Sequence, residues 1–332
     1  MPRLLAVDGN SLGHRGYHSL GHTADAGDRA VTGAVVSMLA TAWGYGPYDG
    51  VVVAFDHPVN RRRREHPEYK ANRPPTPEPI RTALTTLRTD LAACGLTVVE
   101  EEGLEADDLL AAVADGCGAR RWRCDVLSSD RDLTALVEDR IRLLRPRARF
   151  SDLSVEDVAA VRRRYGVEPH RYTELAALRG DPSDGLEGAV GIGEKTAAKL
   201  LREYGSVAAL YERLSELPAK VEASLRTSRE RVERNLLLMA PVPHVDVDVE
   251  GPVVTGLDVE RLTAELTRHG LDRAAHRLRR AITNPVPPPP PTAPPPATPH
   301  NADDHGGGER TGPAAPVTLG VRDGVAEQAP LF

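Results

Sequence analysis

Several short apolar runs of this chain end on an acidic residue, and this arrangement restricts the fold more than any other feature. Asp8 follows Leu-Leu-Ala-Val, Asp56 follows Val-Val-Val-Ala-Phe, and Asp130 follows Val-Leu-Ser-Ser. If these runs are neighbouring strands of one parallel sheet, their carboxyl ends meet at one edge and the acids converge. Carboxylates packed together repel one another unless cations neutralise them. Because Mg²⁺ prefers oxygen ligands, we predict a metal site at this edge.

Further acids lie in three short clusters later in the chain. The full set of predicted metal ligands is Asp8, Asp56, Glu105, Asp107, Asp108, Asp130, Asp132, Asp181 and Asp184. Glu105 and Asp108 are three residues apart and would share one helix face, with Asp107 beside them. Two metal ions held in this way can hydrolyse a phosphodiester by activating a water and stabilising the leaving oxygen. For any single acid, a helix cap or a solvated surface position is an equal alternative.

Apolar β-rich runs alternate with helical patterns in the first half, which predicts an α/β fold with a parallel sheet covered by helices. The expected strands are 3–7, 50–55, 96–100, 123–127 and 140–144, and the expected helices are 31–43, 78–94, 105–115 and 131–137. From about Leu153 the pattern becomes helical. The helices expected there are 171–179, 194–203, 207–215, 218–239 and 259–282.

A basic stretch between Asp56 and Pro79 differs from its surroundings. It contains four consecutive arginines, Arg61 to Arg64, then Tyr69, Lys70 and Arg73, followed by prolines. Because it has little to bury, we predict a loop or helical arch over the mouth of the site. The alternative for the four arginines is a solvated run of charge.

A glycine-rich turn precedes the predicted helix 194–203. Gly191 and Gly193 permit a tight hairpin, and the first turn of the following helix exposes backbone N–H groups that can bind phosphate. Lys195, Thr196 and Lys199 lie in this first part of the helix. The turn is therefore predicted to bind phosphate, the alternative being a helix–turn–helix element used only for packing.

The bulk properties restrict the cellular setting. The net charge is −6, from 42 basic and 48 acidic residues, but local clusters of charge matter more for binding than this average. The three cysteines form no Cys-x-x-Cys pair, so we expect buried thiols in a reducing compartment. The first residues enter a strand without signal-peptide features, and no apolar run is long enough to span a membrane. A cytoplasmic, nucleoid-associated protein is expected.

Seven motifs gain specificity by occurring together. They are Val7-Asp8-Gly9-Asn10, Phe55-Asp56, Tyr69-Lys70-Ala71-Asn72-Arg73-Pro74-Pro75, Glu105-Ala106-Asp107-Asp108, Ser129-Asp130-Arg131-Asp132-Leu133, Gly180-Asp181-Pro182-Ser183-Asp184 and Gly191-Ile192-Gly193-Glu194-Lys195-Thr196-Ala197. With these motifs the chain resembles the bacterial 5′→3′ exonuclease family of flap endonucleases, which also forms the N-terminal domain of DNA polymerase I. The resemblance extends from about Leu4 to Gly205, and more weakly to about residue 280.

The resemblance implies a resolvase-like or PIN-like parallel sheet with a helical arch, followed by a helix-hairpin-helix α domain. It implies two Mg²⁺ ions, for which Mn²⁺ can substitute, with Asp181 and Asp184 completing the second metal site and the other seven acids surrounding the first. It makes Lys70, Arg73 and Arg15 the catalytic cations and lets Tyr69 stack on an unpaired base. It also implies a K⁺ ion at the glycine hairpin, which would grip the duplex backbone.

The composition changes at Asn284. Ten of the fifteen residues from Pro285 to Pro299 are proline, so a core cannot form there. The expected organisation is a nuclease core at 1–170 with the arch at 57–80, a helical DNA-binding region at 171–283 with its helix-hairpin-helix at 186–205, and a proline-rich tail at 284–327. Because no polymerase domain follows, a stand-alone nuclease is expected.

The last five residues, 328–332, are similar to the peptide by which bacterial replication proteins bind the β sliding clamp. Gln328, Leu331 and Phe332 match that peptide, whereas Ala329 replaces its usual leucine. A tethered peptide gains effective concentration when its nuclease is on the same DNA, so clamp binding is expected. The alternative is an inert tail.

Taken together, these features predict a monomeric, metal-dependent 5′→3′ exonuclease or 5′-flap endonuclease. Its substrates would be 5′ flaps, nicks, branched duplexes and RNA primers, as in replication and repair. One alternative is a PIN-type ribonuclease, which shares the sheet and the acids but normally lacks the glycine hairpin. The other is a branched-DNA-binding protein without catalysis, which usually lacks acids of the second metal set.

Overall fold

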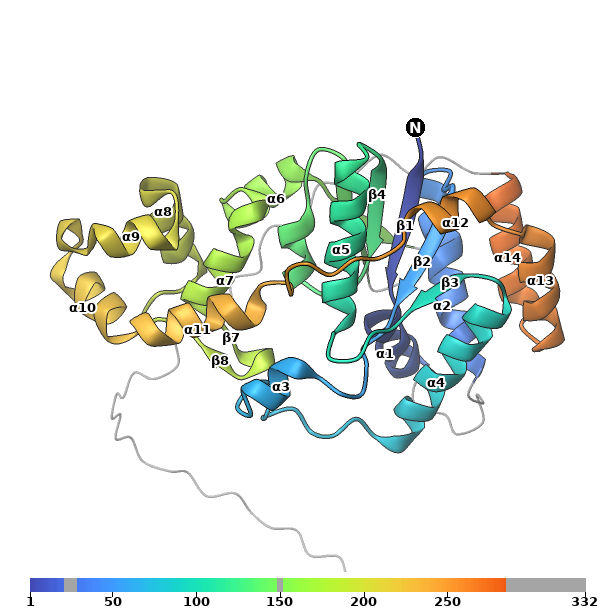
Figure 1. Cartoon of the computed structure of the whole chain (residues 1–332), viewed down its shortest axis with the longest axis horizontal. Helices are drawn as coiled ribbons and strands as arrows, with labels where there is room; N and C mark the ends of the chain where they lie inside the picture. The colour runs from blue at the N-terminus through green and yellow to red at the C-terminus, as the bar shows by residue number, and fades with distance from the viewer. Residues whose placement is uncertain (21–28, 148–151, 285–332) are drawn as a thin grey trace, which may run out of the picture. The chain divides into compact units, whose positions relative to one another are not determined.

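A six-stranded sheet forms the centre of the molecule (Figure 1). The structure is a computed structural model and describes residues 1–20, 29–147 and 152–284. In spatial order the strands are β3 (Thr97–Val99), β2 (Gly50–Ala54), β1 (Arg3–Asp8), β4 (Arg123–Leu127), β5 (Ile141–Pro146) and β6 (Leu153–Glu156). The first five are parallel, which confirms the five predicted strands.

Strand β6 was not predicted, because the residues from Leu153 onward were expected to be helical. It pairs antiparallel with β5, and Leu153 is buried opposite Pro146. Four residues are too few to show the alternation of apolar and polar side chains that marks a strand. The strand is therefore recognised only by its pairing with β5.

Helices cover both faces of the sheet. Leu4 to Val7 of β1 are fully buried, and alternate residues belong to the two hydrophobic cores. One face carries α5 (Ala106–Ala119), α6 (Val158–Tyr165) and α7 (Tyr172–Arg179). The other carries α1 (Gly9–Ser19), α2 (Arg29–Ala42), α4 (Glu78–Ala93), α13 (Val259–Arg268) and α14 (Asp272–Thr283).

The remaining helices follow α7 along the chain, apart from α3 (Arg61–Glu65) in the basic stretch. They are α8 (Glu194–Tyr204), α9 (Val207–Glu212), α10 (Ala219–Thr227), α11 (Arg229–Met239) and α12 (Glu250–Thr255). Two predicted helices are each divided in the structure. Residues 218–239 form α10 and α11, and residues 259–282 form α13 and α14, which meet near Gly270 at a φ of 75°.

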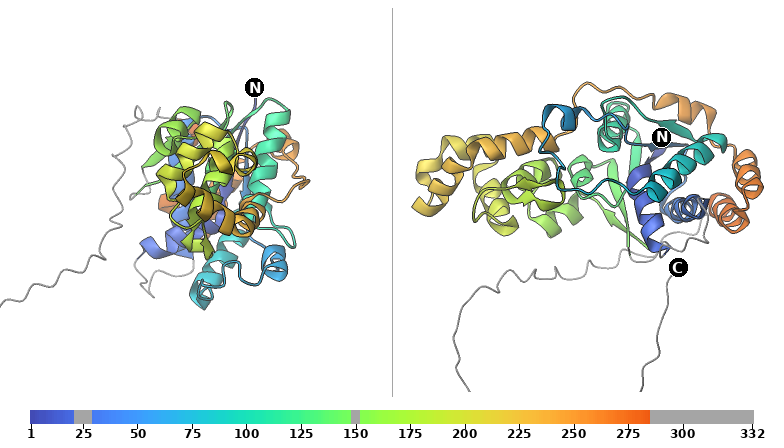
Figure 2. Two further views of the ribbon diagram at one scale, coloured as in Figure 1. Left: turned by 90° about the vertical axis from the view of Figure 1, so that its left-hand side faces the viewer. Right: turned by 90° about the horizontal axis from the view of Figure 1, so that it is seen from below.

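The expected helical region 171–283 also divides by packing. Helices α8 to α10 lie at one end of the described residues, whereas α13 and α14 lie at the other end (Figure 2). Leu262, Leu266 and Leu278 of these last helices are buried in the same core as α2 and α4. Residues after about Glu250 thus return to the nuclease sheet, which the sequence pattern alone did not predict.

The join between β1 and α1 explains one motif. Asp8 ends the strand and caps the helix, because its Oδ1 accepts the backbone N–H of Ser11 at 2.8 Å. A side chain at Gly9 would place its Cβ 2.5 Å from the ring of Phe55. Glycine is therefore required where the first acid-bearing strand turns into its helix beside the second.

The three cysteines, Cys94, Cys117 and Cys124, are buried and free, as predicted. Across the described ranges, none of the helices combines the length and the apolar character that a membrane crossing requires. The predicted proline-rich tail, apart from Asn284, and the predicted clamp-binding residues Gln328, Leu331 and Phe332 lie outside the described residues.

Candidate active site

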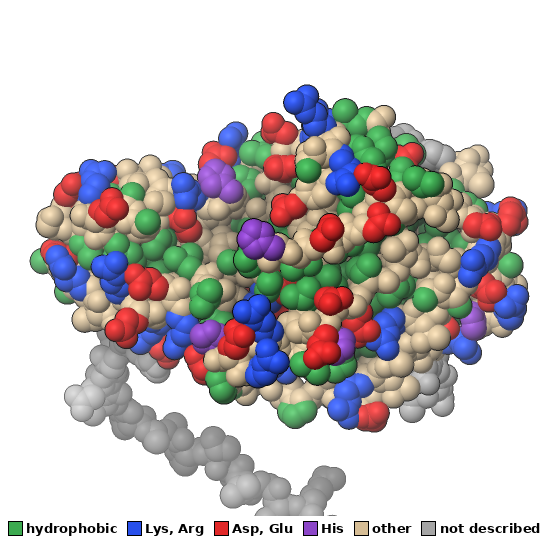
Figure 3. Space-filling model, in the orientation of Figure 1, with side chains coloured by type: hydrophobic (Ala, Val, Ile, Leu, Met, Phe, Trp, Pro, Cys, Tyr) green, Lys and Arg blue, Asp and Glu red, His purple; other side chains and the backbone are tan. Residues whose placement is uncertain are grey.

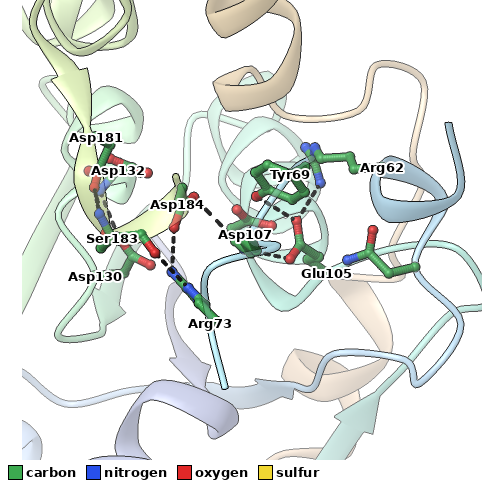
Figure 4. Close-up of polar contacts among 12 residues, drawn as sticks. Arg62, Tyr69, Arg73, Glu105, Asp107, Asp130, Asp132, Asp181, Ser183 and Asp184 are labelled. Carbon is green, nitrogen blue, oxygen red and sulfur yellow. Dashed lines mark hydrogen bonds and ion pairs between the residues drawn. The ribbon is translucent and has the colours of Figure 1, made fainter. Parts of the chain in front are cut away.

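Five separate segments bring the nine predicted acids to the carboxyl edge of the sheet. Asp8 ends β1, and Asp56 lies two residues beyond β2. The Glu105 cluster begins α5, and Asp130 and Asp132 follow β4. Asp181 and Asp184 lie in the two-stranded hairpin of β7 (Gly180–Asp181) and β8 (Leu186–Glu187). Figure 4 shows Asp130, Asp132 and Asp181 on one side and Glu105 and Asp107 on the other, with Asp184 between them next to Arg73.

Neighbouring polar groups fix the first two acids. Asp8 Oδ2 accepts the hydroxyl of Ser128 at 2.6 Å, and that hydroxyl also accepts the backbone N–H of Asp130 at 2.9 Å. Asn10 and Asp56 exchange two hydrogen bonds of 3.0 Å, so Asp56 is held to α1. The sequence analysis did not single out Asn10 or Ser128, although both lie within two residues of a predicted acid.

The carboxylates raise one another's pKa. Burial, and then the charges of Asp56 and Asp130, raise the pKa of Asp8 to about 7 against the opposing hydrogen bonds from Ser128 and Ser11. Burial, followed by the charges of Asp130 and Asp181, raises the pKa of Asp132 to about 7. Such mutual destabilisation is expected where one site is built to hold cations.

Asp132 provides a specific test of whether a metal fits. Its Oδ1 is buried and has no hydrogen-bond partner among the described residues. Burying a carboxylate oxygen without a partner costs free energy, and a bound divalent cation would offset that cost. As the side chains stand, however, no three Asp, Glu, His or Cys groups of the described residues converge closely enough to hold an ion. The donor chemistry fits a hard metal, and the side chains would have to adjust to bind it.

Glu105 is bound by three groups from the basic stretch. Its Oε1 accepts the ammonium of Lys70 at 2.6 Å, and its Oε2 accepts Arg62 at 3.0 Å and the Tyr69 hydroxyl at 3.1 Å. Burial alone would raise the pKa of Glu105, but Lys70 and then Arg62 outweigh it and lower that pKa. The basic stretch is thus anchored in the acid cluster.

Asp108 differs from the other acids because each of its two carboxylate oxygens accepts two hydrogen bonds from the protein. Oδ1 accepts Arg62 Nη2 at 2.6 Å and the backbone N–H of Val242 at 2.8 Å. Oδ2 accepts Arg62 Nη1 at 2.7 Å and the backbone N–H of Glu105 at 3.0 Å, which completes a capping box. The side chain is 0% exposed. With four donors on two oxygens, the carboxylate of Asp108 is saturated by protein groups in this structure, and its binding of a metal stays a prediction.

Tyr69 does not adopt the position expected for base stacking. It is 3% exposed and packs with Leu186 and Leu238, and its hydroxyl donates to Glu105. Burial, and then the charge of Glu105, raise the pKa of this hydroxyl far above its ordinary value, so it stays protonated. In this structure the ring fills a small core with Leu186 and Leu238, and its stacking on an unpaired base stays a prediction.

Lys70 and Arg73 reach the acids as expected. Lys70 has a φ of 56°, an uncommon value for a residue with a side chain, and its ammonium lies 4.0 Å from Asp184 Oδ2. Burial would lower the pKa of Lys70, but the charges of Glu105 and Asp184 raise it, so the ammonium stays charged. Arg73 is half-exposed and pairs with Asp184, and it donates to the carbonyl of Ser183 at 2.9 Å.

Arg15 contacts the end of β5. Its guanidinium donates to the backbone carbonyl of Arg147, one residue beyond β5. Its Nε is buried without a partner among the described residues, and burial lowers its pKa. The structure thus places Arg15 beside the carboxyl end of β5.

The four consecutive arginines divide into one buried and three exposed side chains. Arg62 is 7% exposed and, in addition to its acids, donates to the carbonyl of Ala240 at 2.8 Å. Arg61, Arg63 and Arg64 are exposed on the short helix α3. Figure 3 shows basic side chains gathered over this region next to acidic ones. Arg62 therefore anchors this run in the protein, whereas the other three arginines form a basic surface. Before α4, the only part of the basic stretch that is helical among the described residues is the short helix α3.

The glycine turn has the geometry expected of a phosphate contact. Gly191 has a φ of 74°, and a Cβ at Gly191 or Gly193 would meet nothing within 4 Å. Gly193 caps α8 without a side-chain hydrogen bond, so the first N–H groups of this helix are available. Lys195 and Lys199 are exposed beside them, and Thr196 is half-buried. The α-helix that precedes this turn is α7, which ends before the predicted helix-hairpin-helix span 186–205 begins.

Two family models match most of the chain. Residues 3–166 match the 5′-3′ exonuclease N-terminal resolvase-like domain, and residues 167–258 match the 5′-3′ exonuclease C-terminal SAM fold. DNA polymerase I of Mycobacterium bovis is 39% identical over 246 residues, which are 70% of this chain and 26% of that protein. Thermostable DNA polymerase I of Thermus aquaticus is 34% identical over 80% of this chain and 32% of its own length. The chain therefore spans about a quarter to a third of these relatives.

A solved structure shares the fold. The flap endonuclease of bacteriophage T5, in a pseudo-enzyme–product complex with DNA and metal ions, has a TM-score of 0.60 and 22% identity. The match covers 85% of this chain and 100% of that one.

Proposed function

The chain belongs to the 5′-3′ exonuclease family, and from this premise we propose that it is a metal-dependent nuclease that hydrolyses phosphodiesters at the 5′ ends and 5′ flaps of branched DNA. The observation that carries this proposal is the meeting of acids from five segments at one sheet edge, with two cations among them. DNA flaps, nicks and RNA primers in replication and repair are the proposed substrates, with the protein acting as a monomer.

Eight of the nine acids are proposed to hold two Mg²⁺ ions, which Mn²⁺ can replace, and Asp108 is proposed to organise them. When bound, two such ions would activate a water and stabilise the leaving oxygen. Ser128 and Asn10 keep Asp8 and Asp56 oriented. Lys70 and Arg73 place positive charge beside the acids, where it stabilises charge that develops on a phosphate under attack.

Helix α8 is the proposed contact for the duplex. Its free N–H groups, with Lys195 and Lys199, bind backbone phosphates, and the carbonyls of the glycine turn are proposed to hold K⁺. Contacts to backbone phosphates do not depend on the base sequence, and their affinity falls as the salt concentration rises. Arg15, near β5, is proposed to approach the same strand of substrate.

We expect Lys70→Ala to slow cleavage of a 5′-flap DNA by about 100-fold, because the ammonium acts on charge that develops during the reaction. Binding of the flap, measured in Ca²⁺ or EDTA, is expected to change by less than about threefold, a loss of well under 1 kcal/mol. Single-turnover rates and fluorescence anisotropy measure the two effects. Lys220→Ala removes an exposed lysine from α10 and serves as the matched control. Equal losses in cleavage rate and in affinity for the flap would show that Lys70 only helps to bind the DNA and does not act on the reaction.

Deleting residues 328–332 is expected to abolish association with a bacterial β sliding clamp while leaving the rate on short flaps unchanged. The reason is that a tethered peptide contributes effective concentration and no chemistry. A pull-down with purified clamp and a single-turnover assay measure these two properties. Undiminished clamp association after the deletion would exclude this role of the tail.

A further inference from the structure

Three arginines lie side by side at the amino edge of the sheet, away from the acids. Arg3 of β1 is the direct register partner of Arg123 of β4. The N–H of Cys124 donates to the carbonyl of Arg140 at 3.0 Å, and Cys124 is the partner of Ile141, so Arg140 lies next to Arg123. Neighbouring strands are about 4.8 Å apart, and residues in register point to the same face. Like charges so placed destabilise the sheet unless an anion offsets them.

The described residues offset this arginine row, defined as Arg3, Arg123 and Arg140, only in part, through Asp139 in the same cavity wall. The buried carboxylate of Asp125 is already used by Arg142, through bonds of 2.8 and 2.6 Å, and by the Tyr48 hydroxyl at 2.8 Å. None of the three arginines forms an ion pair with a described residue. Arg3 donates to the carbonyl of Tyr45 at 3.1 Å, and Arg140 Nη1 lies 3.0 Å from the sulfur of Met1.

The row lines a cavity of about 460 Å³. Its walls are Arg3, Arg123, Arg140, Arg142, Asp125 and Asp139, so four positive and two negative groups leave an excess of two positive charges. Because β1 and β4 are parallel, begin at Arg3 and Arg123 and end at or just before Asp8 and Asp130, the cavity and the acid cluster lie at opposite ends of these strands. The proposed cleavage reaction therefore does not use it.

We propose that the arginine row is a second, non-catalytic site that binds phosphate groups, carried either by a nucleotide or by a nucleic-acid backbone. Guanidinium groups present several N–H donors in a plane and match phosphate oxygens better than a point charge does. A cavity of this size is in the range of small-ligand sites. Phosphate is the anion of this chemistry because the proposed reaction acts on nucleic acid, so the choice of anion rests on the proposed function. The site goes beyond that reaction and does not depend on the metal ligands.

The test compares the full chain with Arg123→Gln/Arg140→Gln in EDTA, where cleavage does not occur. Calorimetry measures binding of pyrophosphate and of deoxyadenosine monophosphate, and anisotropy measures binding of a 20-base-pair duplex over a range of salt. The control Arg273→Gln/Arg277→Gln removes the same charge from the exposed side of α14, where neither arginine pairs with a described acid. Metal-dependent flap cleavage and the melting temperature establish that each variant is folded. If the double variant is unfolded, the exposed Arg123→Gln alone replaces it.

We expect the row variant, and not the control, to lose at least tenfold in affinity for a phosphate ligand. Loss for pyrophosphate or the nucleotide assigns the site to a small ligand. Loss for the duplex alone, with a salt slope reduced by about two, assigns it to backbone phosphates. Equal affinity of wild type and row variant for all probes, or no binding by the wild type, would overturn the proposal.

Discussion

Replacing Asp130 with alanine is expected to lower the rate of Mg²⁺-dependent 5′-flap cleavage by about 1,000-fold or more, which corresponds to about 4 kcal/mol of lost transition-state stabilisation. Asp130 is exposed at the end of β4, and its charge raises the pKa of both Asp8 and Asp132. Its removal therefore takes one proposed ligand from the centre of the cluster without leaving a buried cavity.

Melting temperature provides the readout that separates metal binding from catalysis. Since the acids repel one another, Asp130→Ala is expected to melt no lower than wild type in EDTA, and to lose most of the upward shift that Mg²⁺ gives wild type. The control is Asp115→Ala, which removes an exposed acid from α5. Full cleavage activity in Asp130→Ala would disprove the proposed role of this acid.

The acids at strand ends were predictable because the sheet is parallel. Once Asp8, Asp56 and Asp130 were recognised as the ends of strands, the geometry of a parallel sheet placed them at one edge. The family and the fold class that the motifs implied are confirmed by the two family models. A short-range pattern was sufficient here, since each strand is buried on both faces and reads as one apolar run.

The partners of the acids were not predictable in the same way. Nothing local distinguishes Arg62 from Arg61 or Arg63, and only the folded chain shows that one of them is buried against Asp108. The family resemblance implied that Tyr69 stacks on a base, whereas in this structure its ring packs on Leu238 of α11, which is distant in the sequence. Contacts across long sequence separations decide such roles, and a single sequence does not record them.

Arg62 joins three parts of the protein through these contacts. It connects α3 to Glu105 and Asp108 at the start of α5, and to the carbonyl of Ala240 just after α11. The N–H of Val242 binds the same carboxylate of Asp108. The basic stretch and the acid cluster are therefore joined by the two buried ion pairs of Arg62, and hydrogen bonds of Arg62 and Asp108 add the segment that returns to the sheet.

Arg62→Met is expected to destabilise the protein by about 3–5 kcal/mol, because it leaves the carboxylate of Asp108 buried without its counter-charge. The free energy of unfolding of the full chain, measured by urea denaturation, tests this value. Arg63→Met is the matched control, since Arg63 is an exposed neighbour on the same helix. A loss below about 1 kcal/mol, typical of an exposed ion pair, would contradict the role of Arg62 as an anchor.

Asp108→Asn, made alone and together with Arg62→Met, distinguishes a structural acid from a metal ligand. The amide side chain keeps one oxygen, which accepts the N–H of either Val242 or Glu105, and places an NH2 group opposite the other. In the double variant it also removes the unpaired charge. We therefore expect the double variant to be more stable than Arg62→Met. We also expect Asp108→Asn to retain cleavage within about tenfold of wild type below its melting temperature, a cost of at most about 1.4 kcal/mol. A loss as large as that of Asp130→Ala, without a loss of stability, would restore Asp108 to the metal site.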